Sequence, residues 1–457
     1  MGRRTVTRLQ VSGHRFLLRR MAHALVRGDV RMLDDPLRAQ TLSMAAGCAV
    51  AVLVVAGCVI FAHLRPGAAT GDAPIVMDRA SGALYVRIDD TLHPVPNLAS
   101  ARLVVGAPGE PRPVGRGAIA GARRGPSVGI AGAPSAIGPA LSSGDATWTV
   151  CDAESATTMF VGPVEGVRPL DGGSGVLVSA GATATYLVYD GWRARVDLRE
   201  RAVVQALGLD GVVPRPVSRA VLEALPEAPP IAAPRIAGAG APGPAALPGL
   251  TVGTVVRLAR AGAVEHYVVL AGGVQRLGDV AADLIRFTVA QPSGDIPTVA
   301  ADAVAAVPML DAVPVGTFPG RIRAVASPVL CAGWSTSGGG HTNTRLLVGD
   351  SAPSRAPVVD LAQADGEGAA IDAVAVPAGR SVYVRSVPLT GDGPAAGALF
   401  LLDDLGVLFG IRDSEAAKSL GLPEDSVPAP WPMLSLLPRG PELSRAAASV
   451  LRDSVPA

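Results

Sequence analysis

The chain has 457 residues, with 40 Lys and Arg against 39 Asp and Glu, and so carries a formal net charge of +1 at pH 7. A near-neutral chain gives no electrostatic reason to expect nucleic acid as a partner. The length is enough for two or more domains, and 54 Gly and 40 Pro indicate many turns.

The N-terminal segment is strongly basic. The first 40 residues hold nine Arg and three Asp, a net charge of +6, which leaves about −5 for the remainder. Ser12 is a suitable N-cap for a helix from Gly13 to about Val26, on which Arg15 and Arg19 share a face and Arg20 follows. A basic amphipathic helix beside a membrane anchor either docks a partner or lies on anionic lipid, and the residues favour neither alternative.

The longest uncharged stretch runs from Gln40 to Leu64, and we predict a transmembrane helix over 41–64 that includes Leu42, Val52 and Phe61. About 20 apolar residues cross a bilayer core. A cleaved signal peptide is the alternative, but the run is longer than a signal core and lacks a clear cleavage box. Because basic flanks remain inside, the N-terminus is expected in the cytoplasm and the bulk of the chain in the periplasm.

The four cysteines fall into two groups. Cys48 and Cys58 lie in the apolar run and are interpreted as apolar side chains. Cys151 and Cys331 are the only two in the exported part, where an oxidising compartment favours one disulfide between them. Two free buried thiols are the alternative.

The exported part repeats a pattern of two short strands, a turn and a capped helix. The predicted caps are Asn97, Asp197, Asp279 and Asp413. An aromatic precedes each cap, at Tyr85, Tyr186, Tyr267 and Phe400. A single unit of this size cannot bury a core, so each should pack on a neighbour or on a central module.

These observations predict an α+β protein with a single N-terminal transmembrane helix and an elongated periplasmic region of ββα-type repeats around a β-rich central core. The expected segments are a basic tail (1–40), the anchor (41–64), repeat 1 (75–122), core segment a (123–165), repeat 2 (166–226), a linker (227–248), repeat 3 (249–300), core segment b (301–390), repeat 4 (391–428) and a Pro-rich tail (429–457).

Catalytic motifs are absent from the sequence. Ala417 stands where a P-loop glycine would precede the lone lysine, Lys418, and neither HExxH nor GxSxG occurs. The Gly-rich loop Ser335–Asn343, with His341 beside hydroxyls, is the best local candidate, although a surface loop explains it as well. Acidic pairs such as Asp403-Asp404 lie in predicted turns and are expected to be solvated. We therefore predict no catalytic or metal-binding residue.

Several long motifs resemble one family. These are SGHRFLLRRMAHALVRGDVRMLDDPLRAQ before the anchor, IVMDRASGALYVRIDDTLHPVPNLASARLVVG after it, VGIAGAP, WTVCD and the C-terminal APWPMLSLLPRGPELSRAAA. Together they closely resemble EccB, the bitopic membrane component of mycobacterial type VII (ESX) secretion systems, over nearly the whole chain.

The resemblance implies a structural inner-membrane subunit that works with EccC, EccD, EccE and a mycosin-type protease, and that self-associates as a dimer or hexamer. It also implies four repeat domains around a core with one disulfide, and contact with peptidoglycan through repeats similar to a phage lysin module. Some members are labelled ATPases. ATP would be a cofactor here only if that label applies, and no nucleotide motif is present to receive it.

Overall fold

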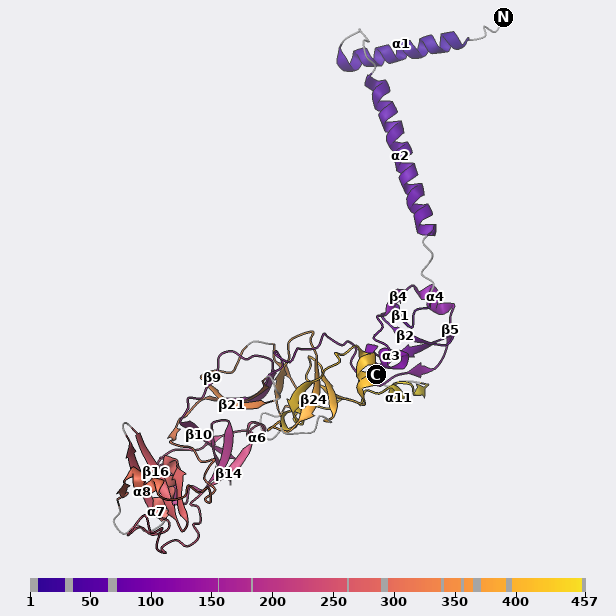
Figure 1. Ribbon diagram of the computed structural model, residues 1–457. Helices are drawn as coiled ribbons and strands as arrows, with labels where there is room; N and C mark the ends of the chain where they lie inside the picture. Colours follow the sequence, from indigo (N-terminus) through magenta and orange to yellow (C-terminus); the bar gives the residue numbers. More distant parts are fainter. Residues whose placement is uncertain are drawn as a thin grey trace, which may run out of the picture. The chain divides into compact units, whose positions relative to one another are not determined.

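The computed structural model describes most of the chain. The described residues are 7–28, 36–64, 72–154, 156–181, 184–260, 263–288, 295–337, 341–354, 357–364, 371–391 and 397–453. They belong to two compact units, Met1–Gly71 and Asp72–Ala457. The fold is mixed α+β, as the sequence predicts: the first unit is helical and the second is rich in β-strands (Figure 1).

The first unit contains two helices, α1 (Arg8–Arg27) and α2 (Pro36–Leu64). Proline at the first position of α2 is favourable, because a helix has no intrahelical partner for that N–H. At 29 residues, α2 is long enough to cross a bilayer.

All four expected repeats are present, but each is larger than a hairpin and a helix. A third strand precedes the hairpin, and after the helix a short strand pairs in parallel with that first strand. In repeats 1 and 2 another short strand closes the opposite edge of the sheet. In repeats 3 and 4 the second strand of the hairpin remains the outer strand on that side.

The elements of the four repeats are as follows. Repeat 1 comprises β1 (Ile75–Asp78), β2 (Leu84–Ile88), β3 (Thr91–Val95), α3 (Leu98–Val105), β4 (Arg112–Val114), α4 (Arg116–Ala120) and β5 (Arg123–Arg124). Repeat 2 comprises β10 (Ser174–Ala180), β11 (Ala184–Tyr189), β12 (Trp192–Val196), α5 (Arg201–Ala206), β13 (Arg215–Pro216), α6 (Arg219–Glu223) and β14 (Glu227–Ile231). Repeat 3 comprises β15 (Val255–Arg260), β16 (Ala263–Leu270), β17 (Gly273–Leu277), α7 (Asp279–Thr288), β18 (Thr298–Val299) and α8 (Ala301–Ala305). Repeat 4 comprises β24 (Val382–Val387), β25 (Leu399–Leu402), β26 (Leu408–Ile411), α9 (Ser414–Leu420), β27 (Val427–Pro430) and α10 (Trp431–Leu434).

The central core is a seven-stranded sheet in the order β22-β23-β8-β7-β20-β21-β9. Its strands are β7 (Trp148–Ala153), β8 (Ala156–Val161), β9 (Arg168–Pro169), β20 (Val329–Thr336), β21 (Thr342–Gly349), β22 (Val359–Asp360) and β23 (Ala373–Ala375). The pairing of β7 with β20 brings together two segments that lie far apart in the sequence.

Hydrophobic packing joins the core to two of the repeats. One cluster contains Trp148 and Trp334 of the core, Val188 of repeat 2 and Met433 of repeat 4. Both tryptophans are almost completely buried, and they face each other across β7 and β20. Because the cluster continues without a break, repeats 2 and 4 are integral to the core.

The other two repeats pack on these through their helices. In one cluster, Leu103 of α3 packs with Leu420 of α9, which joins repeat 1 to repeat 4. In another, Val203 of α5 packs with Leu284 of α7, which joins repeat 2 to repeat 3. The second unit thus contains two similar pairs of repeats, each joined helix to helix.

Two predicted segments are wrong in part. The linker 227–248 begins as strand β14, which pairs in parallel with β12 and closes the sheet of repeat 2. The tail 429–457 begins within β27 and continues through α11 (Arg445–Ala448) to β28 (Leu451–Arg452), which pairs with β6 (Ser127–Val128). In both, the prolines predict a loop, but they lie in strands at the edge of a sheet, where proline is tolerated.

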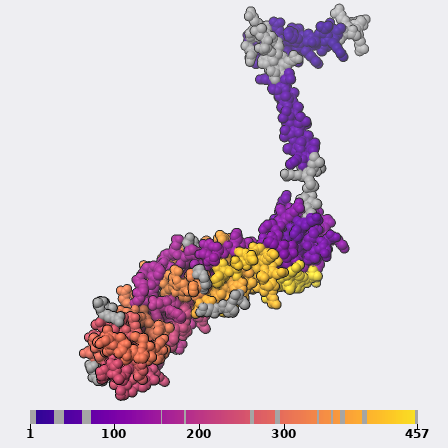
Figure 2. Space-filling view, viewed as in Figure 1, coloured from indigo at the N-terminus to yellow at the C-terminus, as the bar shows by residue number. Residues whose placement is uncertain are grey.

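Other boundaries shift as well. The stretch 301–324 lies inside predicted core segment b, but it carries α8 of repeat 3 and β19 (Arg323–Ala324), which pairs with β10 of repeat 2. Strand β24 also lies inside predicted core segment b, but it pairs with β25 and is the first strand of repeat 4. Figure 2 shows the C-terminal residues, in yellow, against the purple residues of repeat 1, so both ends of the second unit meet there.

Candidate functional site

The basic helix α1 begins earlier than predicted. Its first turn follows Thr7, whose backbone N–H donates to Oε1 of Gln10 at 3.1 Å. Threonine followed three residues later by glutamine is a capping pattern, so this pair starts the helix and Ser12 lies inside it. Arg15, Arg19 and Arg20 are all exposed on α1, where a partner or a surface can reach them.

The same helix exposes apolar side chains. Leu17, Leu18, Met21 and Leu25 are each about half exposed or more. Their spacing of three to four residues places them on one side, while Arg15 and Arg19 lie on another. An amphipathic helix of 20 residues with its apolar side uncovered needs an apolar surface to lie on. Both docking on a partner and contact with anionic lipid would supply one.

Helix α2 exposes its apolar side chains all round. Leu42, Val52 and Phe61 are exposed by 64%, 67% and 63%. The stretch Gln40–Phe61 is long and apolar enough to cross a membrane, and none of its most apolar window is buried in the protein. Within the described residues it is the one helix with these properties, which fits a membrane anchor.

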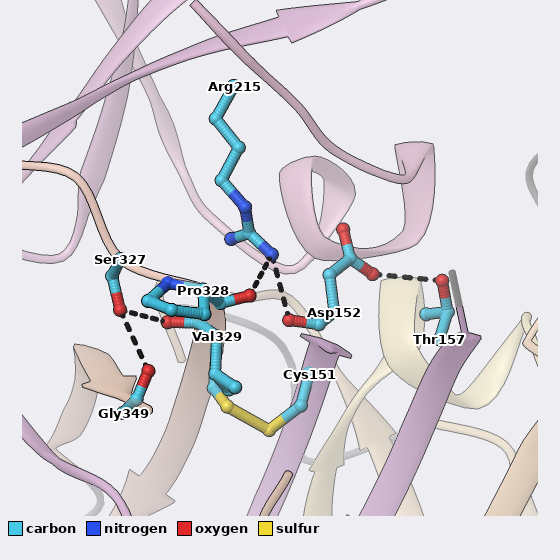
Figure 3. The surroundings of a disulfide bond; sticks show 9 residues. Cys151, Asp152, Thr157, Arg215, Ser327, Pro328, Val329 and Gly349 are labelled. Atoms are coloured by element: carbon cyan, nitrogen blue, oxygen red, sulfur yellow. Dashed lines mark hydrogen bonds between the residues drawn. A yellow bond between two sulfur atoms is a disulfide. The ribbon is translucent and has the colours of Figure 1, made fainter. Parts of the chain in front are cut away.

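The two cysteines of the second unit form a disulfide. Cys151 of β7 and Cys331 of β20 lie directly opposite each other in the antiparallel pair, 180 residues apart in sequence (Figure 3). Both are almost completely buried, at 1% and 0% exposure. The bond therefore joins the two halves of the core sheet, and it encloses repeats 2 and 3 in a covalent loop.

A polar clasp lies beside the disulfide and links the core to repeat 2. The buried carboxylate of Asp152 accepts hydrogen bonds from the Thr157 hydroxyl at 2.8 Å and from the Ser218 backbone N–H at 2.6 Å. Arg215 donates to the carbonyl oxygens of Asp152 (3.1 Å) and Pro328 (2.8 Å), as Figure 3 shows.

The burial of this clasp affects its charges. Burial lowers the pKa of Arg215 below its usual value, and the nearby carboxylate of Asp152 partly opposes that shift. Because a buried charge is costly without partners, each group here stabilises the other. No local pattern in the sequence marks Arg215, and the position of Asp152, directly after Cys151, is the one signal that points to this clasp.

The turn Asp403-Asp404 docks repeat 4 onto the core, and the prediction that both residues are solvated is wrong for Asp403. Burial raises the pKa of Asp403, whose carboxylate accepts the N–H groups of Leu405 and Val407. Asp404 accepts the N–H of Gly379 at 2.7 Å. Because these carboxylates bind backbone of the turn and of the core, they have a structural role.

Of the predicted helix caps, two are found and two are not. Asn97 accepts the Ser100 N–H at 2.9 Å, and Asp413 accepts the Ala416 N–H at 2.8 Å. Asp279 is instead the first residue of α7, and its carboxylate contacts His266 (3.2 Å) and Arg321 (3.0 Å).

Asp197 also has another role. Helix α5 begins after Glu200, and the hydrogen bonds to Asp197 come from the Arg199 side chain and backbone. They hold the pKa of Asp197 at about 2. The predicted cap is wrong because this carboxylate accepts its hydrogen bonds from Arg199, which lies before the first residue of the helix.

The Gly-rich loop Ser335–Asn343 shows no pairing of a nucleophile with a base in its described part. Residues 338–340 lie outside the described residues. Ser337 donates its backbone N–H to the carbonyl of His341 at 2.9 Å, which closes a hairpin between β20 and β21. In the part of the chain that the structure describes, no group of three or more His, Cys, Asp or Glu side chains is placed to hold a metal ion.

These features define a class of protein: a membrane-anchored chain with a basic amphipathic helix before one apolar helix, followed by a disulfide-linked domain built from four repeats. Comparison with known families then identifies the family. The pattern of the family described as "Type VII secretion system ESX-1, transport TM domain B" matches residues 3–457. The chain belongs to this family, the EccB proteins of type VII secretion.

Named relatives support the same family assignment. The chain is 37% identical to the "ESX-3 secretion system ATPase EccB3" of Mycolicibacterium smegmatis, with 98% of this chain and 91% of the relative covered. It is 36% identical to the "ESX-5 secretion system ATPase EccB5" of Mycobacterium tuberculosis, covering 98% and 94%. It is 35% identical to the "ESX-1 secretion system ATPase EccB1" of M. smegmatis, covering 100% and 97%.

Solved structures show the same fold. One chain of "Structure of an intact ESX-5 inner membrane complex" is 34% identical and has a TM-score of 0.74, with 100% of this chain and 98% of that chain covered. A chain of "Structure of EccB3 dimer from the ESX-3 core complex" is 34% identical and has a TM-score of 0.73, with 82% and 100% covered.

Proposed function

We propose that this protein is a structural subunit of a type VII (ESX) inner-membrane complex needed for protein export. In this proposal α2 crosses the inner membrane once, the N-terminus and α1 are cytoplasmic, and residues 72–457 are periplasmic. The observation that carries it is the match to EccB chains of ESX membrane complexes over nearly the whole length, anchor included.

The topology follows from charge and from the disulfide. The basic residues before α2 favour a cytoplasmic N-terminus. A disulfide persists in an oxidising compartment, which favours a location outside the membrane for the second unit. We further propose that the chain assembles with EccC, EccD, EccE and a mycosin-type protease, and that copies associate as dimers or hexamers. The ESX-3 relative described as a dimer supports self-association.

Blue-native electrophoresis of gently solubilised host membranes tests this proposal. The full-length protein should migrate in a complex far larger than a dimer. A variant without residues 7–28 should lose that migration if α1 is the docking element, whereas one with Cys48→Ser should retain it. Migration of the full-length protein as a monomer or dimer under gentle conditions would contradict the proposal.

ATP hydrolysis is a second candidate, because the printed names of the relatives call them ATPases. Lys418 is exposed in the second half of α9, away from the helix N-terminus, where a P-loop lysine would follow its phosphate-binding loop. Purified full-length protein should therefore hydrolyse no ATP above a blank, and hydrolysis that survives Lys418→Ala would require a site other than a P-loop. A third candidate, peptidoglycan contact through the repeats, is tested by sedimentation of the protein with purified sacculi.

A further inference from the structure

One face of the repeat 1 sheet collects arginines. Arg87 of β2 is in register with Leu92 of β3, which is in register with Arg124 of β5. Cross-strand neighbours point to the same side of a sheet, so Arg87 and Arg124 share a face. The guanidinium of Arg124 lies over the Tyr85 ring, 5.7 Å from its centre, on that side.

The face extends across the whole sheet. Arg112 of β4 is in register with Val76 of β1, and Val76 packs with Ile119 of α4. Helix α4 therefore covers this side, and Arg116 is its first residue. We call Arg87, Arg112, Arg116 and Arg124 the arginine face.

The charges of the arginine face lack acidic partners. Of the residues that the structure describes, none forms a salt bridge with Arg87, Arg112 or Arg116, and the salt bridge of repeat 1 joins Arg102 to Glu110. The Nε and Nη2 atoms of Arg87 are buried with no hydrogen-bond partner among the described residues, so no group of repeat 1 neutralises this side chain.

Neighbouring acidic groups do not neutralise the face. The carboxylate of Asp78 interacts with Arg116 electrostatically, but its hydrogen bonds come from the Ser81 hydroxyl at 2.7 Å and the Ala80 N–H at 3.1 Å. Residues 72–126 contain seven Arg against five Asp and Glu, a net charge of +2. Residues 127–457 contain 23 Lys and Arg against 31 Asp and Glu, a net charge of −8. Positive charge in the second unit is therefore concentrated in its first repeat.

The covalent chain keeps repeat 1 near the membrane. Eight Cα steps separate Leu64, the last residue of α2, from Asp72, and such a chain spans at most about 28 Å. A short tether gives the second binding event a high effective concentration. This restriction holds whichever side of the membrane the second unit occupies.

The chemistry of the face favours lipid headgroups over a protein. Protein interfaces combine arginine with buried apolar or aromatic anchors at their centre, but repeat 1, described throughout from Asp72 to Arg124, leaves no large hydrophobic side chain exposed beside its arginines. Arg112, Arg116 and Arg124 are all exposed. Guanidinium groups bind phosphate oxygens through paired hydrogen bonds, and anionic headgroups present phosphate as a dense layer.

We propose that the arginine face of repeat 1 binds the anionic phospholipid headgroups of the membrane in which α2 is anchored. This contact goes beyond the proposed role in secretion and does not depend on it. It would fix the orientation of repeat 1 against the bilayer, and through its packing on repeat 4 it would orient the rest of the second unit.

Full-length protein in nanodiscs tests the contact. In a Cys48→Ser, Cys58→Ser background, a fluorophore is attached at Ala120→Cys, an exposed position at the end of α4. Quenching by a headgroup spin-labelled lipid is then compared in phosphatidylcholine alone and with phosphatidylglycerol added. We expect stronger quenching with the anionic lipid, and its reversal at high salt.

Two matched triple variants distinguish an effect of the arginine face from an effect of the total net charge of the protein. With Arg112→Gln, Arg116→Gln and Arg124→Gln, the ratio of bound to free repeat 1 should fall by on the order of 100-fold. The control removes three exposed arginines of other modules, by Arg201→Gln, Arg345→Gln and Arg412→Gln, and should leave quenching unchanged. Quenching that is equal in both lipids, or that both triples reduce alike, overturns the proposal. The former result would leave an acidic protein as the partner to seek.

Discussion

At the scale of single residues, the most informative positions are those that join modules. Cys151 and Asp152 are adjacent on β7, yet one forms a covalent bond to β20 while the other binds the backbone of repeat 2. The cysteine pair was predictable because only two cysteines lie outside the anchor. The clasp of Asp152 with Arg215 was not, because it depends on which strand ends meet in three dimensions.

The Cys151→Ser variant should be less stable than the wild type under oxidising conditions. A bond that closes a loop of 180 residues restricts the unfolded chain, and its loss should lower the free energy of unfolding by about 2–5 kcal/mol. Chemical denaturation of full-length protein in detergent measures this difference. With reductant sufficient to open the bond, variant and wild type should unfold alike, and a difference that persists would assign the effect to packing at this position.

Asp403 should make stability depend on pH. Because burial raises its folded-state pKa above the ordinary 3.8, the folded state holds this proton at pH values where the unfolded state has lost it. The contribution of this group to stability therefore falls as pH rises from the ordinary pKa through the raised one.

The Asp403→Asn variant tests that dependence. It keeps an oxygen acceptor for the Leu405 and Val407 N–H groups and cannot ionise. Its stability relative to the wild type should increase as pH rises from about 4 to neutrality. The exposed Asp171→Asn is the matched control for the removal of one carboxylate elsewhere on the surface. A parallel pH dependence of wild type and Asp403→Asn would refute the assignment.

At the scale of elements, α7 packs into two hydrophobic clusters through two consecutive residues. Leu284 packs in the cluster of repeat 2, whereas Ile285 packs in the cluster of its own repeat. Both are completely buried. Consecutive helical positions differ in direction by about 100°, which is how one short helix can contact both modules.

Leu284→Ala and Ile285→Ala should therefore have different effects despite similar volume loss. Each should cost about 2–5 kcal/mol in local stability. Leu284→Ala should also speed amide hydrogen exchange in α5 (Arg201–Ala206) because the joint between repeats is loosened, whereas Ile285→Ala should speed exchange in β15 and β16 and leave α5 protected. Equal exchange in α5 for both variants would mean that the two repeats unfold as one cooperative unit.

The repeats show how far the sequence predicts such elements. The hairpin and main helix were predictable in all four, because a tight turn and a buried aromatic such as Tyr85 or Tyr267 recur at similar spacing. The predicted pattern does not include the first strand, because segments of different length separate it from the hairpin, up to the residues between Val387 and Leu399 in repeat 4. Caps at Asn97 and Asp413 were predictable from local chemistry, whereas Asp279 has tertiary partners that local chemistry does not reveal.

At the scale of the whole second unit, its first and last segments form one module. Leu443 and Ala448, both completely buried, belong to the cluster that holds repeat 1 against repeat 4, and β28 pairs with β6. The C-terminal segment is thus part of the fold, although its prolines and glycine resemble those of a tail.

Deletion of residues 440–457 should therefore separate repeat 1 from repeat 4. Limited proteolysis of the full-length protein should then cut between 124 and 148, a segment that should resist in the wild type, and the melting temperature should fall. Deletion of 454–457 alone leaves the cluster and β28 in place and is the matched control. Wild-type resistance in the longer deletion would show that α3 and α9 hold the repeats together by themselves.

The disulfide also determines which segments of the chain would bear a mechanical force. A pull applied at the membrane anchor enters repeat 1 and passes to repeat 4 and the core, while repeats 2 and 3 lie inside the closed loop between Cys151 and Cys331. The 180-residue loop cannot be drawn out while the bond is intact, so the force bypasses repeats 2 and 3. A protease cut within the loop would likewise release no fragment. Repeats 2 and 3 therefore bear no load along the covalent chain, although hydrogen bonds to Asp152 still hold repeat 2 on the core.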